Sequence, residues 1–238
     1  MRWFAGLLLA LLSMAAHAQT YRLAHDQLFP PFAEAKGGVS SGIAVDLMKA
    51  AADRAGFSIV FVGVPFDQVG ATLGDGRADA IFPLAINPER RQQYDFSTPI
   101  MVTGGSLYVR APASTPTLAE LAGKSVATPR TGPLAGFIQR TAPDVRLETV
   151  TDYETALQAL VDGKYDAVAL NATVGGVLAE KLHPGKVTPA GKMFLELPLA
   201  IAVPKGARAD LIGAFDRGIA AIRADGAWER INRTAAGR

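Results

Sequence analysis

LGDGRADAI at residues 73–81 and LVDGKYDAV at residues 160–168 are two copies of one nine-residue phrase. Both fit L-x-D-G-[R/K]-x-D-A-[I/V], in which a helix-like stretch ends at Asp-Gly and a second Asp leads into an apolar strand. Glycine ends helices because it adopts the left-handed backbone without strain. The shared positions indicate an internal duplication. The alternative is that a common helix-turn-strand motif occurs twice independently and gives the same sequence pattern. Either origin predicts two α/β lobes, and two lobes predict a cleft for a ligand.

The composition favours a folded domain and excludes several classes of function. Half of the 238 residues are hydrophobic (49%) and 19% are charged, so a packed core is expected, in one large domain or two small ones. The net charge is +2 with no Lys/Arg run, which argues against a nucleic-acid partner. The absence of cysteine excludes disulfides, iron–sulfur clusters and thiol catalysis.

The N-terminus has the layout of a secretory signal peptide. Arg2 precedes the apolar residues 4–14, and Ala16-His17-Ala18 is an A-x-A cleavage site. We therefore expect residues 1–18 to be removed. No cysteine follows the site, so no lipid anchor is expected, and no other stretch reaches ~20 apolar residues. These features predict a soluble exported protein, in the simplest case in a bacterial periplasm.

Strands that alternate with helices predict lobes built on mostly parallel sheets flanked by helices. The predicted strands cover residues 21–24, 57–62, 80–84, 106–110, 124–128, 145–150, 166–170 and 197–203. The predicted helices cover residues 43–55, 67–73, 134–141, 153–161, 172–182, 208–223 and 226–234, and one more starts at the N-cap Asn87. Residues 25–33 and 95–99 are expected to be loops, and Thr117 with Glu120 and Thr151 with Glu154 are expected capping boxes.

The chain is expected to cross twice between its lobes. Residues 111–117, rich in Pro, Ser and Thr, indicate an exit from the first lobe, and the strand at 197–203 indicates a return. We therefore expect a first, discontinuous lobe of residues 19–109 with 199–238 and a second lobe of residues 110–198. The crossing strands near residues 106–110 and 198–203 would form a hinge that closes around a ligand.

Ligands of open parallel α/β sheets bind beyond the carboxyl ends of the strands. This rule selects the loop after the first strand, with Asp26, Phe29 and Phe32, and also Phe66, Arg90, Asn171 and the loop at residues 130–132. Arg90 could grip a carboxylate with two parallel hydrogen bonds, or be a solvated helix residue. Phe29 and Phe66 could sandwich a ligand or pack in a core. Asp26 could accept a hydrogen bond from a ligand amine or amide, or form a turn. Asn171 could face the ligand, cap the next helix, or do both. The loop at residues 130–132 belongs to the second lobe.

Enzymatic constellations are sparse in this sequence. His25 and His183 are isolated, so metal ligation lacks partners. G-x-S-x-G, P-loop and H-E-x-x-H motifs are absent. We therefore expect no catalytic residue, no metal and no cofactor.

Several segments make the chain resemble the bacterial periplasmic solute-binding proteins that feed polar amino acids and related compounds to ABC importers. The segments are DQLFPPF at 26–32, SGIAVDL at 41–47, NPER at 87–90, YDFSTP at 94–99, LAELAGKSVA at 118–127 and ADGAW at 224–228. The resemblance implies a monomer with a type II periplasmic binding fold, without catalysis, that hands its ligand to a membrane permease. It also implies that Arg90 takes the ligand carboxylate, that Phe29 and Phe66 flank the ligand, and that Asp26 lies near its side chain. Backbone groups of Pro83 and Ala85, and the loop at Thr131 and Gly132, would complete the site.

The chain departs from this family at two positions. Amino-acid binders typically have an Asp at the position of Asn171, which pairs with the ligand ammonium, and many have Thr or Ser in place of Ala85. Either another carboxylate such as Asp26 holds the ammonium, or the ligand lacks one. Two other functions on the same fold stay open: a periplasmic enzyme similar to the cyclohexadienyl and arogenate dehydratases, and a ligand-sensing module for a membrane receptor.

Overall fold

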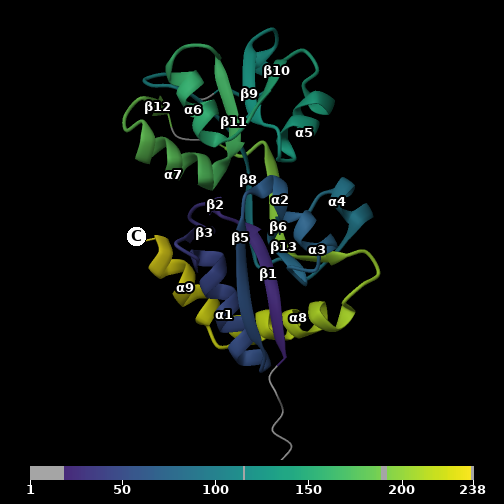
Figure 1. The fold of residues 1–238 in the computed structure, drawn as a ribbon. Coiled ribbons are helices and arrows are strands. Elements are labelled where there is room, and N and C mark those ends of the chain that lie inside the picture. Colours follow the sequence, from purple (N-terminus) through teal and green to yellow (C-terminus); the bar gives the residue numbers. More distant parts are fainter. Residues whose placement is uncertain (1–18, 115, 189–191, 237–238) are drawn as a thin grey trace, which may run out of the picture.

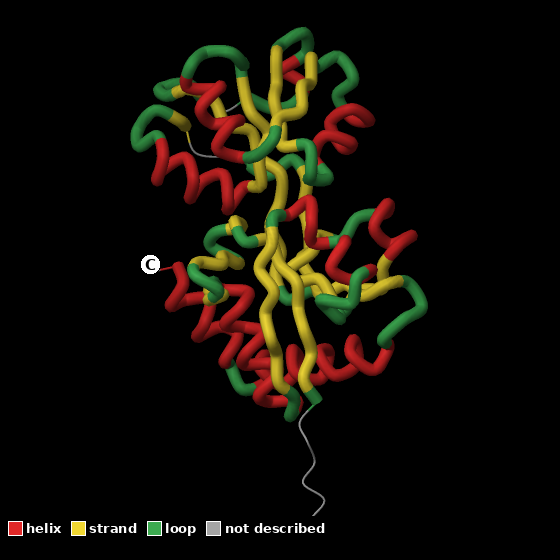
Figure 2. The backbone as a smooth tube through the Cα atoms, viewed as in Figure 1, coloured by secondary structure: helices red, strands yellow, loops and turns green. Residues whose placement is uncertain are grey.

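Two α/β lobes lie one above the other in the computed structural model, which describes residues 19–114, 116–188 and 192–236 (Figure 1). The expected signal peptide at residues 1–18 lies outside the described residues. One path of hydrogen-bonded strands runs through both lobes in the order β10-β9-β11-β8-β13-β6-β1-β5. Helices lie along the sides of the strands in each lobe (Figure 2). The duplicated phrase therefore does mark two lobes of similar design.

The first lobe is built on three parallel strands in the order β5-β1-β6. These strands are β1 (Thr20–Asp26), β5 (Ser58–Val64) and β6 (Ala80–Ala85). The helices of this lobe are α1 (Ile43–Ala55), α2 (Phe66–Val69), α3 (Ala71–Gly74), α4 (Pro88–Gln93), α8 (Ala209–Ala224) and α9 (Ala227–Ala236). Helix α1 has the predicted bounds, because Gly56 ends it in the left-handed conformation (φ 76°).

The second lobe repeats this plan with three parallel strands in the order β10-β9-β11. Its strands are β9 (Ser125–Pro129), β10 (Arg146–Val150) and β11 (Ala167–Asn171), with the short β12 (Val187–Thr188) paired to β8. Its helices are the 3-10 helix η1 (Ala119–Leu121), α5 (Leu134–Thr141), α6 (Tyr153–Val161) and α7 (Ala172–Leu182). Helices α5, α6 and α7 have the predicted bounds.

Two long antiparallel strands, β8 (Met101–Arg110) and β13 (Leu195–Pro204), connect the lobes. Strand β8 pairs with β11 of the second lobe and β13 with β6 of the first. The prediction placed the start of β8 at residue 106, five residues late, because Gly104 and Gly105 do not look like strand residues. A Cβ on Gly104 would lie 2.2 Å from the carbonyl oxygen of Leu195, so glycine is needed where the two strands approach closely.

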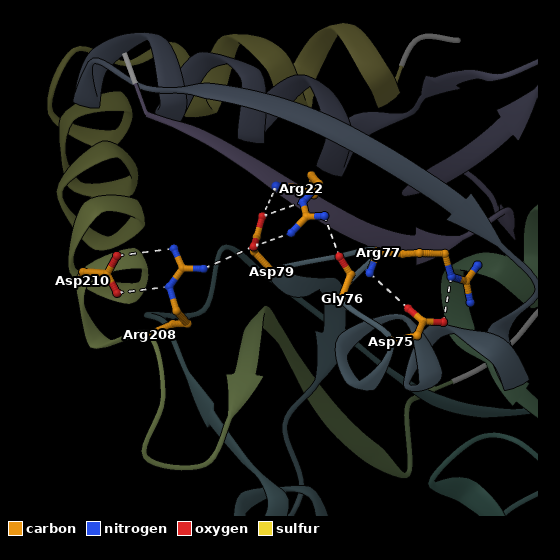
Figure 3. Close-up of polar contacts among 7 residues, drawn as sticks. All are labelled: Arg22, Asp75, Gly76, Arg77, Asp79, Arg208 and Asp210. Carbon is orange, nitrogen blue, oxygen red and sulfur yellow. Dashed lines mark hydrogen bonds and ion pairs between the residues drawn. The ribbon is translucent and has the colours of Figure 1, made fainter. Parts of the chain in front are cut away.

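The second Asp of each repeat fastens its own strand to the first strand of the same lobe. Asp79 donates its N–H to the Arg22 carbonyl at 2.8 Å. Its carboxylate accepts the Arg22 N–H, also at 2.8 Å (Figure 3). Asp166 makes the same pair of bonds with Ser125, at 2.9 and 2.8 Å. The repeated sequence therefore has the same structural role in both lobes: its glycine ends a helix, and its second aspartate joins two neighbouring strands.

Short strands and one cap differ from the prediction. The expected loop at 25–33 contains β2 (Leu28–Phe29) and the start of β3 (Ala33–Lys36), which form a small sheet with β4 (Val39–Ser41). The expected loop at 95–99 overlaps β7 (Tyr94–Phe96), which pairs with β13. The Thr151 capping box is wrong, because Asp152 caps α6 by accepting the Thr155 N–H at 2.8 Å. The box of Thr117 and Glu120 is confirmed, ahead of η1.

Candidate functional site

A cavity between the two lobes brings together nine of the residues that the sequence nominates, whereas Phe32 is buried in the core and does not line it. Its volume is about 670 Å³, counting the part that opens to solvent. The first lobe contributes Asp26, Phe29, Phe66, Pro83, Ala85 and Arg90, and the second contributes Thr131, Gly132 and Asn171. Clefts of this size with a few polar groups among apolar walls are typical of small-molecule sites.

Arg90 brings positive charge into this cavity from the first turn of α4. Asn87 caps the helix by accepting the Arg90 N–H at 2.7 Å, as the sequence predicts. The Arg90 guanidinium donates to the Ala85 carbonyl at 2.8 Å and lies 5.8 Å from the centre of the Phe66 ring. Burial lowers the pKa of Arg90, and no ion pair involves it among the described residues. Its other donors are therefore available to an anion in the cleft.

Asp26 ends β1 on the same wall of the cavity. Its carboxylate accepts the Leu28 N–H at 2.9 Å, which is the turn contact considered from sequence. Burial raises the pKa of Asp26 to about 6, and the charge of Asp67 contributes to the rise. A carboxylate that is difficult to ionise and that lines a cleft is a common feature of functional sites.

Asn171 ends β11 and is 5% exposed. Its Oδ1 accepts the N–H groups of Thr173 and Val174, both at 3.1 Å, and the Thr103 hydroxyl at 2.9 Å. The side chain therefore caps α7, as one reading of the sequence proposed. It also lines the cavity.

The apolar part of the cavity comes from both lobes. Phe29 is held against Phe32, with ring centroids 5.2 Å apart, and Phe66 begins α2. Pro83 and Ala85 lie at the end of β6, where the chain turns toward α4. These residues give a ligand an apolar surface beside the charged groups of the first lobe.

Seven further residues line the cavity but were not predicted from the sequence, namely Thr128, Pro129, Pro133, Leu134, Tyr153, Leu197 and Leu199. Tyr153 begins α6 just after β10, so the strand-end rule could have found it. Burial raises the pKa of its hydroxyl, and the nearby Asp26 charge raises it further. Leu197 and Leu199 line the cavity from β13. Their apolar side chains in a mostly buried strand cannot be told from core residues in the sequence.

Two further hollows flank the cavity between the lobes. One borders Asp26 and Tyr153, and the other borders Arg90 and also Glu89 and Arg140. The Arg140 guanidinium of α5 and the Glu89 carboxylate of α4 form an ion pair of 3.1 Å that joins the lobes. More than half of each of these side chains is exposed, so the pair contributes at most about 1 kcal/mol.

The described residues show neither a metal-binding cluster nor a membrane-spanning helix. They contain no group of three or more His, Cys, Asp or Glu side chains that could hold a metal ion. No helix among them is long and apolar enough to cross a membrane.

Known proteins resemble this chain along nearly its whole length. The L-cystine-binding protein TcyJ of Escherichia coli K12 is 25% identical over 208 residues, which cover 86% of this chain and 77% of that protein. The virulence sensor protein BvgS of Bordetella bronchiseptica is 26% identical over 83% of this chain, but over only 16% of its own length.

A solved structure shares both the fold and a similar level of identity. An ancestral arginine-binding protein bound to glutamine has a TM-score of 0.79 and 26% identity, over 92% of this chain and 98% of that chain. The model of the bacterial extracellular solute-binding proteins, family 3, matches residues 21–237. With its two-lobed fold and interlobe cavity, the chain belongs to this family.

Proposed function

We propose that this protein is a periplasmic solute-binding protein that captures a small carboxylate-bearing ligand, an amino acid or related compound, in its interlobe cleft. The single observation that carries the proposal is the Arg90 guanidinium, which lines the cavity and forms no ion pair among the described residues. A desolvated guanidinium binds a carboxylate through two parallel hydrogen bonds. The membrane permease of an ABC importer would receive the ligand.

The proposal assigns a task to each group in the cleft. Arg90 takes the carboxylate, Phe29 and Phe66 flank the ligand body, and Asp26 lies within reach of its polar end. The backbone of Pro83 and Ala85, the loop at 131–132, and Asn171 complete the enclosure. The protein would act without catalysis or a cofactor, as a monomer, with its lobes dividing within β8 and β13.

Calorimetry with a panel of amino acids and small carboxylates tests this function. Arg90→Ala is expected to weaken binding of the best ligand about 100-fold, because two charge-assisted hydrogen bonds are lost. Arg91→Ala is the matched control, since the neighbouring Arg91 is exposed and lies outside the cavity. Full carboxylate affinity in the Arg90→Ala variant would refute the assignment.

A sensory role is the second candidate, because the match to the sensor protein BvgS covers 83% of this chain. The same closure around a ligand would then report to a membrane receptor instead of feeding a permease. Crosslinking of the liganded protein in its own cells, followed by identification of the partner, separates a permease from a receptor.

A further inference from the structure

The orientation of the Asn171 amide is decided by the helix that it caps. The Thr173 and Val174 N–H groups can only donate, so the atom that faces them at 3.1 Å must be the oxygen Oδ1. Oδ1 also accepts the Thr103 hydroxyl, so three donors occupy it. The amide nitrogen forms none of the described hydrogen bonds. This nitrogen is not fully buried either. Among the described residues, Ser106 Oγ is the one side-chain nitrogen or oxygen atom that is fully buried without a hydrogen-bond partner. Asn171 therefore offers N–H donors to the cavity.

This donor lies close to the expected carboxylate clamp. Thr103, which contacts the amide, pairs with Leu197 across β8 and β13. Leu199 pairs with Ala85, whose carbonyl accepts the guanidinium of Arg90. Leu197 and Leu199 both line the cavity and lie two residues apart, about 7 Å along a strand. A small ligand on these two leucines would meet the guanidinium at one end and the Asn171 amide at the other.

An α-amino acid fits this arrangement poorly. Its ammonium is bonded to the carbon next to the carboxylate, and it needs acceptors there, whereas Asn171 presents donors. The charged acceptor of the cavity, Asp26, borders the flanking hollow that contains Asp67, and Arg90 does not border that hollow. Arg90 borders the opposite hollow, with Glu89 and Arg140. Asp26 is therefore better placed for the distant end of a ligand than for an ammonium beside the clamped carboxylate.

We propose that Asn171 determines ligand specificity by donating a hydrogen bond to an uncharged oxygen. The ligand class is then a 2-oxo or 2-hydroxy carboxylate, which carries a carbonyl or hydroxyl oxygen where an α-amino acid carries its ammonium. This inference rests on the proposed function, because it takes the carboxylate of the ligand to be bound at Arg90.

Matched ligand series test the proposal directly. Each series keeps one side chain and changes one group: phenylalanine, phenylpyruvate and phenyllactate; leucine and 4-methyl-2-oxopentanoate; glutamate, 2-oxoglutarate and 2-hydroxyglutarate. The mature protein is unfolded, dialysed and refolded to remove any ligand carried through purification, and is then titrated at pH 7 by calorimetry. In the series that binds, the oxygen compound is expected to bind about tenfold or more tightly than the amino acid.

The Asn171→Asp variant reverses the chemistry at constant shape. One carboxylate oxygen can still cap α7, and the other becomes an acceptor that faces the cavity. The variant is expected to gain about tenfold or more for the amino acid and to lose a similar factor for the oxygen compound. Gln139→Glu is the charge-matched control, because Gln139 is exposed on α5 of the same lobe, and it should leave the preference unchanged. Thermal unfolding checks that both variants are folded.

The possible outcomes separate this inference from the function beneath it. Tighter binding of the oxygen compound, with reversal in Asn171→Asp, supports the role of Asn171. Tighter binding of the amino acid by the unaltered protein overturns that role and leaves the carboxylate-binding function standing. Failure of every member of every series to bind at millimolar concentration overturns both.

Discussion

In each lobe an asparagine begins the helix that follows the repeat strand, but the two asparagines have different surroundings. Asn87 caps α4 with one hydrogen bond and does not line the cavity that contains Asn171, whereas Arg90 of the same helix does line it. Asn171 caps α7 with two backbone bonds and lines the cavity itself. The cavity wall formed by the first lobe (the first wall) is therefore charged, and the cavity wall formed by the second lobe (the second wall) is neutral. The two walls differ although the lobes share the same order of strands and helices.

The two aspartates that join strands also differ in the charge of their partners. Asp79 binds Arg22 through backbone and guanidinium, and it also receives Arg208 at 3.3 Å from the segment that leads into α8 (Figure 3). Asp166 binds Ser125 alone, through its N–H and its hydroxyl. The chain leaves the first lobe along β8 and returns through β13, and Asp79 ties the returning segment to β1. The continuous second lobe needs no such tie.

The largest expected effect concerns the packing of the returning helix. A Cβ at Gly218 of α8 would lie 2.3 Å from the Ala51 carbonyl oxygen of α1. Gly218→Ala should lower the free energy of unfolding by about 3 kcal/mol, because backbone cannot move aside as a side chain can. Urea unfolding followed by circular dichroism measures this change.

Neighbouring glycines provide the controls for this prediction in both lobes. Gly213→Ala in α8 meets only the end of Arg217, at 3.6 Å, and should be neutral or stabilising. In the second lobe Gly175→Ala would meet the Tyr108 ring at 2.8 Å, and should destabilise less than Gly218→Ala. Equal stability of the Gly218→Ala and Gly213→Ala variants would mean that α8 is not held as closely on α1 as described.

The asparagine caps give the next largest effect and test the comparison directly. Asn171→Ala should reduce the free energy of unfolding by about 2 kcal/mol, since two backbone N–H groups and the Thr103 hydroxyl lose their acceptor. Asn87→Ala removes one such bond and should cost about 1 kcal/mol. Chemical unfolding of both variants checks the order. A larger effect for Asn87→Ala would contradict the account of the second wall.

How far the sequence predicted this molecule depends on whether the signal was local. The repeat phrase, the glycine after α1 and the Asn87 cap are short-range patterns, and each placed its element correctly. Strands β2, β4 and β7 have two or three residues each, which is too short for a period-two pattern to show, and β7 forms by pairing with the distant β13. The strand-end rule selected seven of the nine predicted residues that line the cavity, and the family resemblance added Pro83 and Ala85. The rule missed Leu197 and Leu199 because apolar residues that line a cleft look like core residues in sequence.

Acid unfolding should distinguish the two strand-joining aspartates. Burial raises the pKa of Asp79, but the hydrogen bonds and charge of Arg22 and the charge of Arg208 outweigh it and leave a net decrease. Hydrogen bonds from Ser125 lower the pKa of Asp166. A depressed carboxyl pKa stabilises the fold above the unfolded value, near 4, and that stability is lost as the pH falls through the folded value.

Both aspartates should therefore contribute at pH 7 and less at pH 3. Asp79→Asn should cost about 1.5 kcal/mol at pH 7, and Asp166→Asn less than about 1 kcal/mol, because Asp79 holds two guanidinium groups and Asp166 none. Urea titrations at both pH values measure the four differences. A loss that stays the same at pH 3 would show that the charge of the carboxylate is not involved.

The last effect has the opposite sign and compares the two walls of the cavity. The folded pKa of Asp26 is about 6 because of burial, against an ordinary value of 3.8. The folded state thus holds the proton more tightly, so wild-type stability falls as the pH rises from about 4 to 6 and stays lower above that. Asp26→Asn cannot ionise, and should therefore be more stable than wild type at pH 8 and of about wild-type stability at pH 4. Unfolding at these two pH values measures the gain, and a loss of stability at pH 8 would mean that a cation pairs with Asp26. Removing the charge of Asp26 from the first wall would then stabilise the protein, whereas removing the Asn171 side chain from the second wall destabilises it. That contrast is expected if the first wall keeps an unpaired charge for its ligand and the second wall uses its polar side chain to hold the fold as well.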